Sequence, residues 1–133
     1  MEYPLDELLD KRSIIQLKIE RFEGEKIEKE SLKKEFSDYT FAINGYISKN
    51  VCTIEEIKNW HNRLYEINGK CWDLESAIRQ GKEGELGLEE VGRRALKLRD
   101  MNKKRIGIKR EVVNKTGVGY KDIKINHASE END

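Results

Sequence analysis

The strongest candidates for chemistry are polar side chains that repeat every seven residues between residues 53 and 80. Seven residues make about two turns of an α-helix, so residues at this spacing form a column along one side of a helix. One column comprises His61, Asn68 and Glu75, and a parallel column comprises Tyr65, Trp72 and Arg79. Both columns flank the apolar positions. They are therefore placed to contact a ligand or a neighbouring helix.

A second feature is Arg105, which occupies a position where the heptad pattern places a core residue, midway between Leu98 and Val112. Asn102 and Lys109 lie about one helical turn on either side. A guanidinium in such a position must be paired or must open onto a ligand, because an unpaired buried charge is very costly.

Two interpretations of this arginine stay open. In the first, a carboxylate such as Glu75 or Asp73 pairs with Arg105 in an internal hydrogen-bonded network that fixes the register of the helices. In the second, the arginine belongs to a ligand site. The candidate ligand-binding residues of that site are Trp72, Arg79, Asn102, Arg105 and Lys109.

The segment from Arg93 to Arg110 is strongly basic, with nine Lys or Arg residues and a single acidic residue, Asp100. A solvated face that pairs with acidic neighbours is one explanation. The other is an anion-binding surface, since arginine forks match phosphate oxygens in pairs. Duplex nucleic acid is not an expected partner, because the chain has a formal net charge of zero and no helix-turn-helix or zinc-finger spacing.

Signals for an enzyme are absent from the sequence. Neither GxGxxG nor GxxxxGK[ST] occurs. Cys52 and Cys71 form no CxxC motif, and Cys71 falls in the heptad pattern as a small buried residue. His61 lies in a helix and His127 in the polar C-terminal segment. We therefore expect a non-catalytic protein of the reducing cytoplasm, with no cofactor and no metal site.

Long helices must position these residues. Charged residues make up 39% of the chain, against about 25% in typical domains, yet the charges balance and there is a single proline. This composition favours long helices with solvated outer faces over disorder. Apolar residues at three- and four-residue spacings predict helices over residues 4–22, 25–49, 53–80 and 88–114.

The third and fourth helices carry the clearest local signals. Thr53 and Glu56 form a capping box at the start of the third helix. The short link GKEGELG predicts that the third and fourth helices are antiparallel neighbours. The predicted fold is an all-α bundle of about four helices over residues 1–117, followed by a loose polar tail over residues 118–133. No apolar stretch approaches the ~20 residues that a membrane span needs.

Three segments resemble an uncharacterised bacterial helical family of unknown function. They are LDELLDKRSIIQLKIERF, LYEINGKCWDLESAIR and RDMNKKRIGIKREVVNKTG, with D-K-x-[ST]-I, L-W-D-x-E-x-x-I-R and N-x-x-R-x-x-x-K-R-E as the shared patterns. Cys71 departs from the leucine of the family pattern. The resemblance implies a helical fold and carries no activity, ligand or catalytic residue. Its polar positions include Asn68, Asn102 and Arg105.

Two functions are compatible with these patterns. The first is a non-catalytic module that binds an anionic small molecule, a nucleotide or a sugar phosphate, as a nucleotide-sequestering protein does. The second is a structural or protein-interaction bundle that forms homo-oligomers through its long helices. The aromatic residues that could supply such a contact are Tyr39, Tyr46, Trp60 and Tyr65.

Overall fold

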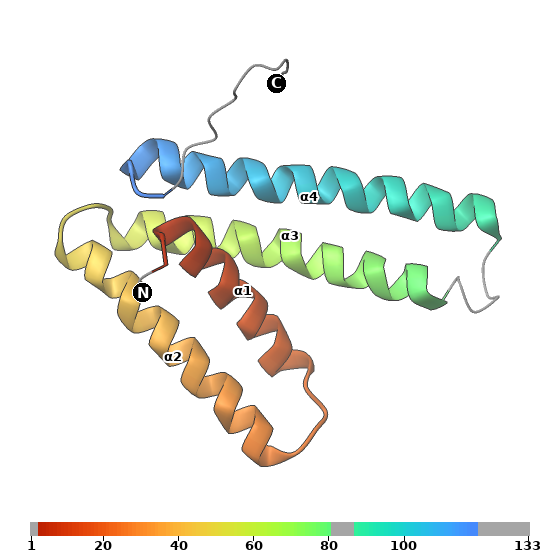
Figure 1. Ribbon diagram of the computed structural model, residues 1–133, viewed down its shortest axis with the longest axis horizontal. Helices are drawn as coiled ribbons and strands as arrows, with labels where there is room; N and C mark the ends of the chain where they lie inside the picture. Colours follow the sequence, from red (N-terminus) through yellow and green to blue (C-terminus); the bar gives the residue numbers. More distant parts are fainter. Residues whose placement is uncertain (1–2, 81–86, 120–133) are drawn as a thin grey trace.

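Four helices make up nearly all of the part of the chain that the structure describes. The computed structural model describes residues 3–80 and 87–119, except for the side chain of Gln80. The helices are α1 (Leu5–Arg21), α2 (Lys26–Ser48), α3 (Ile54–Gln80) and α4 (Leu88–Thr116), and these residues contain no strand. The all-α bundle predicted from the sequence is confirmed (Figure 1).

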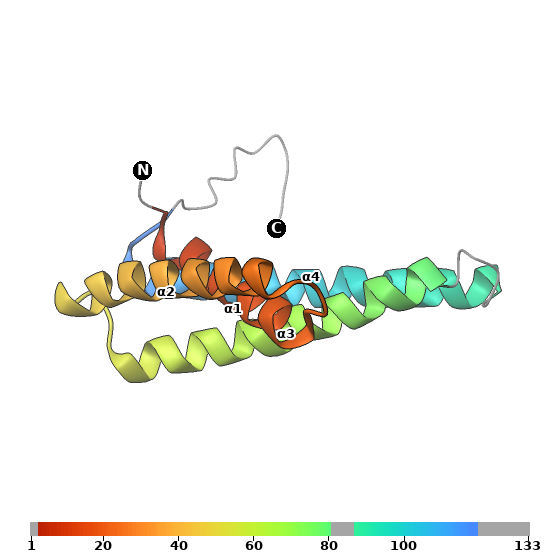
Figure 2. The same cartoon turned by 90° about the horizontal axis from the view of Figure 1, so that it is seen from below.

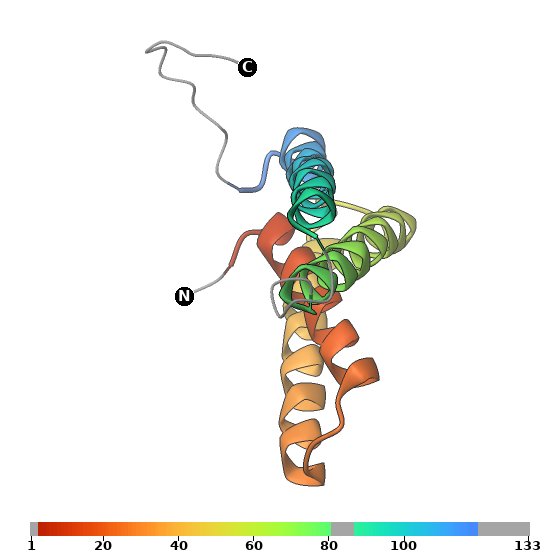
Figure 3. The same cartoon turned by 90° about the vertical axis from the view of Figure 1, so that its right-hand side faces the viewer.

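The helices are arranged as two antiparallel pairs. The pair α3–α4 is the longer one and extends well past the ends of α1 and α2 (Figures 1 and 2). Helix α1 packs against each of the other three helices, whereas α2 packs mainly against α1. In the end-on view of Figure 3, α1 lies between α2 and the α3–α4 pair. The predicted antiparallel pairing of the last two helices is confirmed.

The hydrophobic core lies where α1 crosses the α3–α4 pair. Leu5 and Leu9 of α1, Leu64 of α3 and Val112 of α4 are completely buried there. Near the end of α3 and the start of α4, apolar side chains are less buried, and Leu88 at the start of α4 is 91% exposed. The core is therefore confined to the region that α1 covers.

The helix ends follow local sequence chemistry. The Thr53 hydroxyl accepts a hydrogen bond from the Glu56 N–H at 3.1 Å, and the Glu56 carboxylate accepts one from the Thr53 N–H at 2.9 Å, which confirms the predicted capping box. Helix α4 ends at Gly117, whose φ of 70° is the left-handed conformation that glycine adopts most readily. After it, Val118 packs against the core.

Two apolar residues are more exposed than the sequence pattern predicts. Ile27 is 77% exposed, and Ala95 is exposed, although the apolar pattern along their helices predicts that both lie on a core face. Leu17 is buried, although the apolar pattern of its helix places Ile15 and Ile19 on the core face and not Leu17. Periodicity marks a potential core face, but burial also requires a second element against that face. The predicted link and tail fall largely on residues 81–86 and 120–133, outside the described residues.

No helix within residues 3–80 and 87–119 is both long enough and apolar enough to cross a membrane.

Candidate functional site

Asp10 is the centre of a buried polar network that joins three helices. Arg105 of α4 donates two hydrogen bonds to its carboxylate, from Nε to Oδ1 at 3.0 Å and from Nη2 to Oδ2 at 2.6 Å. Asn68 of α3 donates from Nδ2 to Asp10 Oδ1 at 2.9 Å and to Ser13 Oγ at 2.9 Å. The Ser13 hydroxyl in turn donates to the Asp10 carbonyl at 2.7 Å. The network ties α1 to both helices of the long pair.

The electrostatics of this network keep Asp10 charged. Burial by itself disfavours the ionised carboxyl, but the hydrogen bonds from Arg105 and Asn68 outweigh burial and hold its pKa below the usual value. The hydrogen bonds that Arg105 donates to Asp10 likewise raise the pKa of Arg105. The two side chains therefore form a charge-assisted pair with fork-to-fork geometry.

A second cation of α4, Lys109, lies near the same carboxylate. Its Nζ is 2.9 Å from Glu7 Oε2 and 3.9 Å from Asp10 Oδ2. Next to it, Asp6 is buried, and its Oδ1 has no hydrogen-bond partner among the described residues. Burial, together with the charge of Glu7, raises the pKa of Asp6. Two cations and three carboxyl groups therefore occupy this interface, with no excess of positive charge.

A cavity of about 190 Å³ opens on the other side of Arg105. It lies where α1 meets the α3–α4 pair, and half of its wall is polar side chains. The lining residues are Ile14, Leu17, Asn68, Cys71, Trp72, Glu75, Asn102 and Arg105. The Arg105 side chain is 30% exposed while that of Asp10 is 3% exposed, so the carboxylate lies behind the guanidinium as seen from the cavity.

The structure brings three of the five predicted ligand-binding residues together. Trp72, Asn102 and Arg105 line the cavity. Lys109 is not among the lining residues and pairs with Glu7 instead. Arg79 is exposed and donates to Ser76 Oγ at 3.2 Å within its own helix.

The carboxylate partner of Arg105 is the main difference from the sequence-based expectation. Neither Glu75 nor Asp73 pairs with it. Glu75 lines the cavity and has no ion pair with another described residue, and Asp73 pairs with Arg21 at 2.8 Å. The actual partner is Asp10 of α1, which lies far from Arg105 in the sequence, so the sequence gave no indication of the contact. One signal was available, because Asp6, Asp10, Ser13 and Leu17 recur at the spacing of a single helix face.

A second polar chain runs along the opposite side of α1. Arg12 Nε donates to His61 Nδ1 at 3.1 Å, so the imidazole proton is on Nε2, which donates to Gln16 Oε1 at 2.7 Å. Gln16 Nε2 then donates to Glu20 Oε2 at 3.1 Å, and the Tyr65 hydroxyl donates to the same carboxylate. Burial, and secondarily the charge of Arg12, lower the pKa of His61 to about 4. The histidine is therefore a neutral link and is not poised to exchange protons near neutral pH.

Cys71 has little nucleophilic character despite its place in the cavity wall. Burial raises the pKa of its thiol, which points to Asn102 Oδ1 with a sulfur-to-oxygen distance of 3.7 Å. A protonated thiol is a poor nucleophile and a poor metal ligand. Within the described residues, no three His, Cys, Asp or Glu side chains come together as a metal site would require.

The basic helix α4 divides its charges between ion pairs and solvent. Arg93 and Arg94 both pair with Glu90, while Arg105 and Lys109 pair with α1. Four further cations are exposed without an ion pair among the described residues, namely Lys97, Arg99, Lys103 and Lys104. The basic run thus serves in part to attach α4 to α1 and in part as a solvated face.

Comparisons of the chain with protein-family models, with curated proteins and with solved structures find no match. The candidate site therefore rests on its own geometry. The residues of the network and cavity come from the three segments named above for their resemblance to a helical family. Folding brings those segments together at Asp10, Asn68 and Arg105.

Proposed function

We propose that this protein is a non-catalytic binding module whose cavity beside Arg105 holds the anionic group of a small molecule, such as a nucleotide or a sugar phosphate. The observation that carries the proposal is the position of Arg105, which lines a cavity while a buried carboxylate holds it from behind. A guanidinium fixed in this way loses little conformational freedom when a ligand binds.

Several donors around the cavity have spare hydrogen-bonding capacity. Arg105 uses Nε and Nη2 for Asp10, and its Nη1 has no partner among the described residues. Asn102 and Trp72 line the same cavity, and the amide nitrogen of the first and the indole N–H of the second likewise donate no hydrogen bond to described residues. Three such donors from two helices suit the oxygen atoms of a phosphoryl or carboxylate group.

The size of the cavity limits what it can enclose. At about 190 Å³ it is smaller than the roughly 300–1,000 Å³ of sites that engulf a drug-sized ligand. We therefore place only the anionic group inside, with the rest of the molecule against the rim. The Arg21 guanidinium lies over the Trp72 ring at 5.2 Å from its centre, and the partly exposed ring borders the cavity, where a base or sugar would contact it.

The charge around the cavity favours a ligand that also carries hydroxyl groups. Asp10 balances Arg105, and Glu75 adds a carboxylate with no ion pair among the described residues. A bare anion would gain little from such a surface. A ribose or sugar hydroxyl can donate to Glu75 while the phosphate accepts from Arg105 and Asn102, which supports nucleotides and sugar phosphates over inorganic anions.

No group around the cavity supports a catalytic role. The Cys71 thiol is protonated, and His61 lies on the other side of α1 with a pKa of about 4. Glu75 is exposed, whereas Asp10 is buried and paired with Arg105. Nucleophilic catalysis needs a nucleophile and a base within hydrogen-bonding reach of each other, and no such pair is found among the described residues that line this cavity.

Isothermal titration of the wild-type protein against a panel of nucleotides and sugar nucleotides tests the proposal. We expect at least one ligand to bind, and Asn102→Ala to weaken that binding. This variant leaves the Asp10–Arg105 pair intact, since Asn102 takes part only in the weak contact with Cys71. Lys104→Ala removes an exposed cation from the same helix and is the matched control. Heat signals absent across the whole panel would overturn the proposal.

A further inference from the structure

Helix α2 carries a stripe of four residues that is largely open to solvent, since three of them are exposed and Gly45 is partly exposed. Its residues Asp38, Ala42, Gly45 and Lys49 recur at intervals of four, three and four, the spacing that keeps side chains on one face of a helix. Phe41 borders the stripe and is 82% exposed. Only Ile43 of this helix is buried, because α2 packs mainly against α1.

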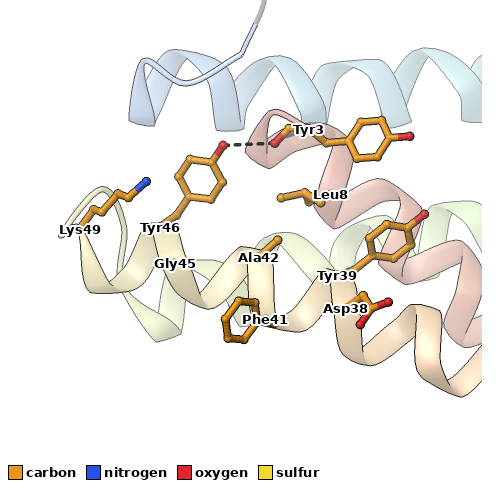
Figure 4. A pocket seen from close by; sticks show the side chains of 9 residues that line it. All are labelled: Tyr3, Leu8, Asp38, Tyr39, Phe41, Ala42, Gly45, Tyr46 and Lys49. Carbon is orange, nitrogen blue, oxygen red and sulfur yellow. Dashed lines mark hydrogen bonds between the residues drawn. The ribbon is translucent and has the colours of Figure 1, made fainter. Parts of the chain in front are cut away.

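The stripe borders a groove of about 340 Å³ between α1 and α2. Figure 4 shows Leu8, Ala42 and Tyr39 along it, and the Tyr46 hydroxyl donating to the Tyr3 carbonyl at 3.2 Å. The walls are predominantly apolar. An exposed apolar groove next to an exposed phenylalanine is the kind of surface that marks a contact with another protein.

Nothing in the part of the chain that the structure describes requires a glycine at position 45. A glycine inside a helix costs about 1 kcal/mol relative to alanine. A Cβ atom at this position would have nothing within 4 Å, so no neighbour in the described chain requires its absence. Glycine and alanine on one helix face allow a second helix to approach closely, and Gly45 and Ala42 lie next to each other on this stripe.

The stripe is also complementary to itself. The stripe is symmetric about the peptide bond between Ile43 and Asn44. Ala42 is the second residue before this bond and Gly45 the second after it, while Asp38 is the sixth before it and Lys49 the sixth after it. When two such helices pack antiparallel about a two-fold axis at this bond, alanine lies level with glycine at the centre. Each aspartate lies level with a lysine of the other copy. Isologous contacts require this kind of self-complementarity.

We propose that two copies of this protein associate through α2, packed antiparallel about a two-fold axis that passes the Ile43–Asn44 bond. Asp38 of each copy then meets Lys49 of the other, and Phe41 is covered at the flank of the contact. The local pair of Asp38 with Lys34, at 3.0 Å, is exposed and readily exchanged for the contact between copies. The proposal is independent of the ligand cavity, which lies on the other side of α1.

The outer face of α4 is a poorer candidate for the same contact. It also contains exposed apolar residues, Leu96 and Ile106, and glycines with open space around them. However, Lys97, Lys103 and Lys104 are exposed there, and a second copy would bring like charges together. The stripe of α2 pairs opposite charges instead.

Sedimentation velocity of the full chain over a range of concentrations tests the inference. We expect a reversible dimer for the wild type and a dissociation constant raised about tenfold or more by Gly45→Gln. We expect the folded monomer to tolerate the substitution, because a Cβ atom at position 45 would have no described atom within 4 Å. Gly107→Gln, at an equally open glycine of α4, is the matched control and should leave the dimer intact. A wild type that stays monomeric at all concentrations would overturn the inference.

A charge exchange tests the register itself. Asp38→Lys alone and Lys49→Asp alone should each weaken the dimer, because each places like charges opposite one another. The double variant Asp38→Lys/Lys49→Asp should restore it, since the exchanged pairs again have opposite signs. Circular dichroism melts verify that every variant is folded. A dimer that Gly107→Gln disrupts, or a double variant no better than the single ones, would refute the α2 contact in this register.

Discussion

Truncating Arg105 provides the most direct test of the buried network. Arg105→Ala removes both hydrogen bonds to the Asp10 carboxylate, which is 3% exposed, and lets water of the adjoining cavity approach the unpaired charge. Breaking one side of a buried ion pair costs about 3–5 kcal/mol. Asn68 and Lys109 remain within reach of Asp10, at 2.9 Å and 3.9 Å, so we expect a loss at the lower end, about 3 kcal/mol.

Thermal and urea unfolding measure this loss. For a domain of this size, about 3 kcal/mol corresponds to a melting temperature lower by roughly 10 °C. Asp10→Asn should cost less than Arg105→Ala, because Arg105 is 30% exposed and can turn toward solvent. The double variant Asp10→Asn/Arg105→Met should be more stable than Arg105→Ala alone. Lys104→Ala is the control, with an expected change within about 0.5 kcal/mol.

The pH dependence identifies Asp10 as the cause. In the wild type the pKa of Asp10 is lowered, so its stabilising contribution is present at neutral pH and is lost as pH falls through the folded-state value. Without Arg105, burial dominates and raises the pKa of Asp10 above its unfolded value, so acid protonates the carboxyl and relieves the unpaired charge. The stability gap between wild type and variant should therefore narrow as pH falls. A gap that is constant from neutral to acidic pH, or below about 1 kcal/mol, would refute the reasoning.

Three further predictions concern other parts of the fold. Leu64→Ala should lower the free energy of unfolding by about 2–5 kcal/mol, because Leu64 is completely buried beneath α1. Chemical denaturation measures this change, and a loss below about 1 kcal/mol would contradict the assigned core. Thr53→Ala should cost about 1 kcal/mol through loss of the capping box, whereas Thr53→Asp, which keeps a capping oxygen, should cost much less in the same assay. The folded-state pKa of His61, about 4, lies below the unfolded value of 6.5, so between these pH values the unfolded chain binds a proton that the folded protein does not. The free energy of unfolding should therefore fall by up to about 1.4 kcal/mol per pH unit as pH drops from 6.5 towards 4. NMR titration of the imidazole signals checks this directly, and a folded-state pKa near 6.5 would show that the chain linking Arg12 to His61 is absent in solution.

The helices and most of their ends are determined by the sequence itself. Helix formation depends on residues three and four positions apart and on local caps, and both kinds of signal are visible without a structure. Thr53 and Glu56 make the predicted capping box, and α4 ends at Gly117. The position of Arg105 in the heptad likewise indicated that its charge needs a partner.

Which carboxylate supplies that partner was decided by the tertiary structure. Helical periodicity describes the faces of one helix, but it contains no information on the angle and register at which two helices cross. Asp10 meets Arg105 only because α1 crosses the α3–α4 pair at that level, whereas Glu75, on the adjacent helix, faces the cavity instead. The same limit applies to α2. Its helical pattern was predictable from the sequence, but the exposure of some of its apolar side chains was not. Ile27 and Phe41 stay exposed because no other described helix lies against them, and an element's own sequence does not specify where its neighbours end.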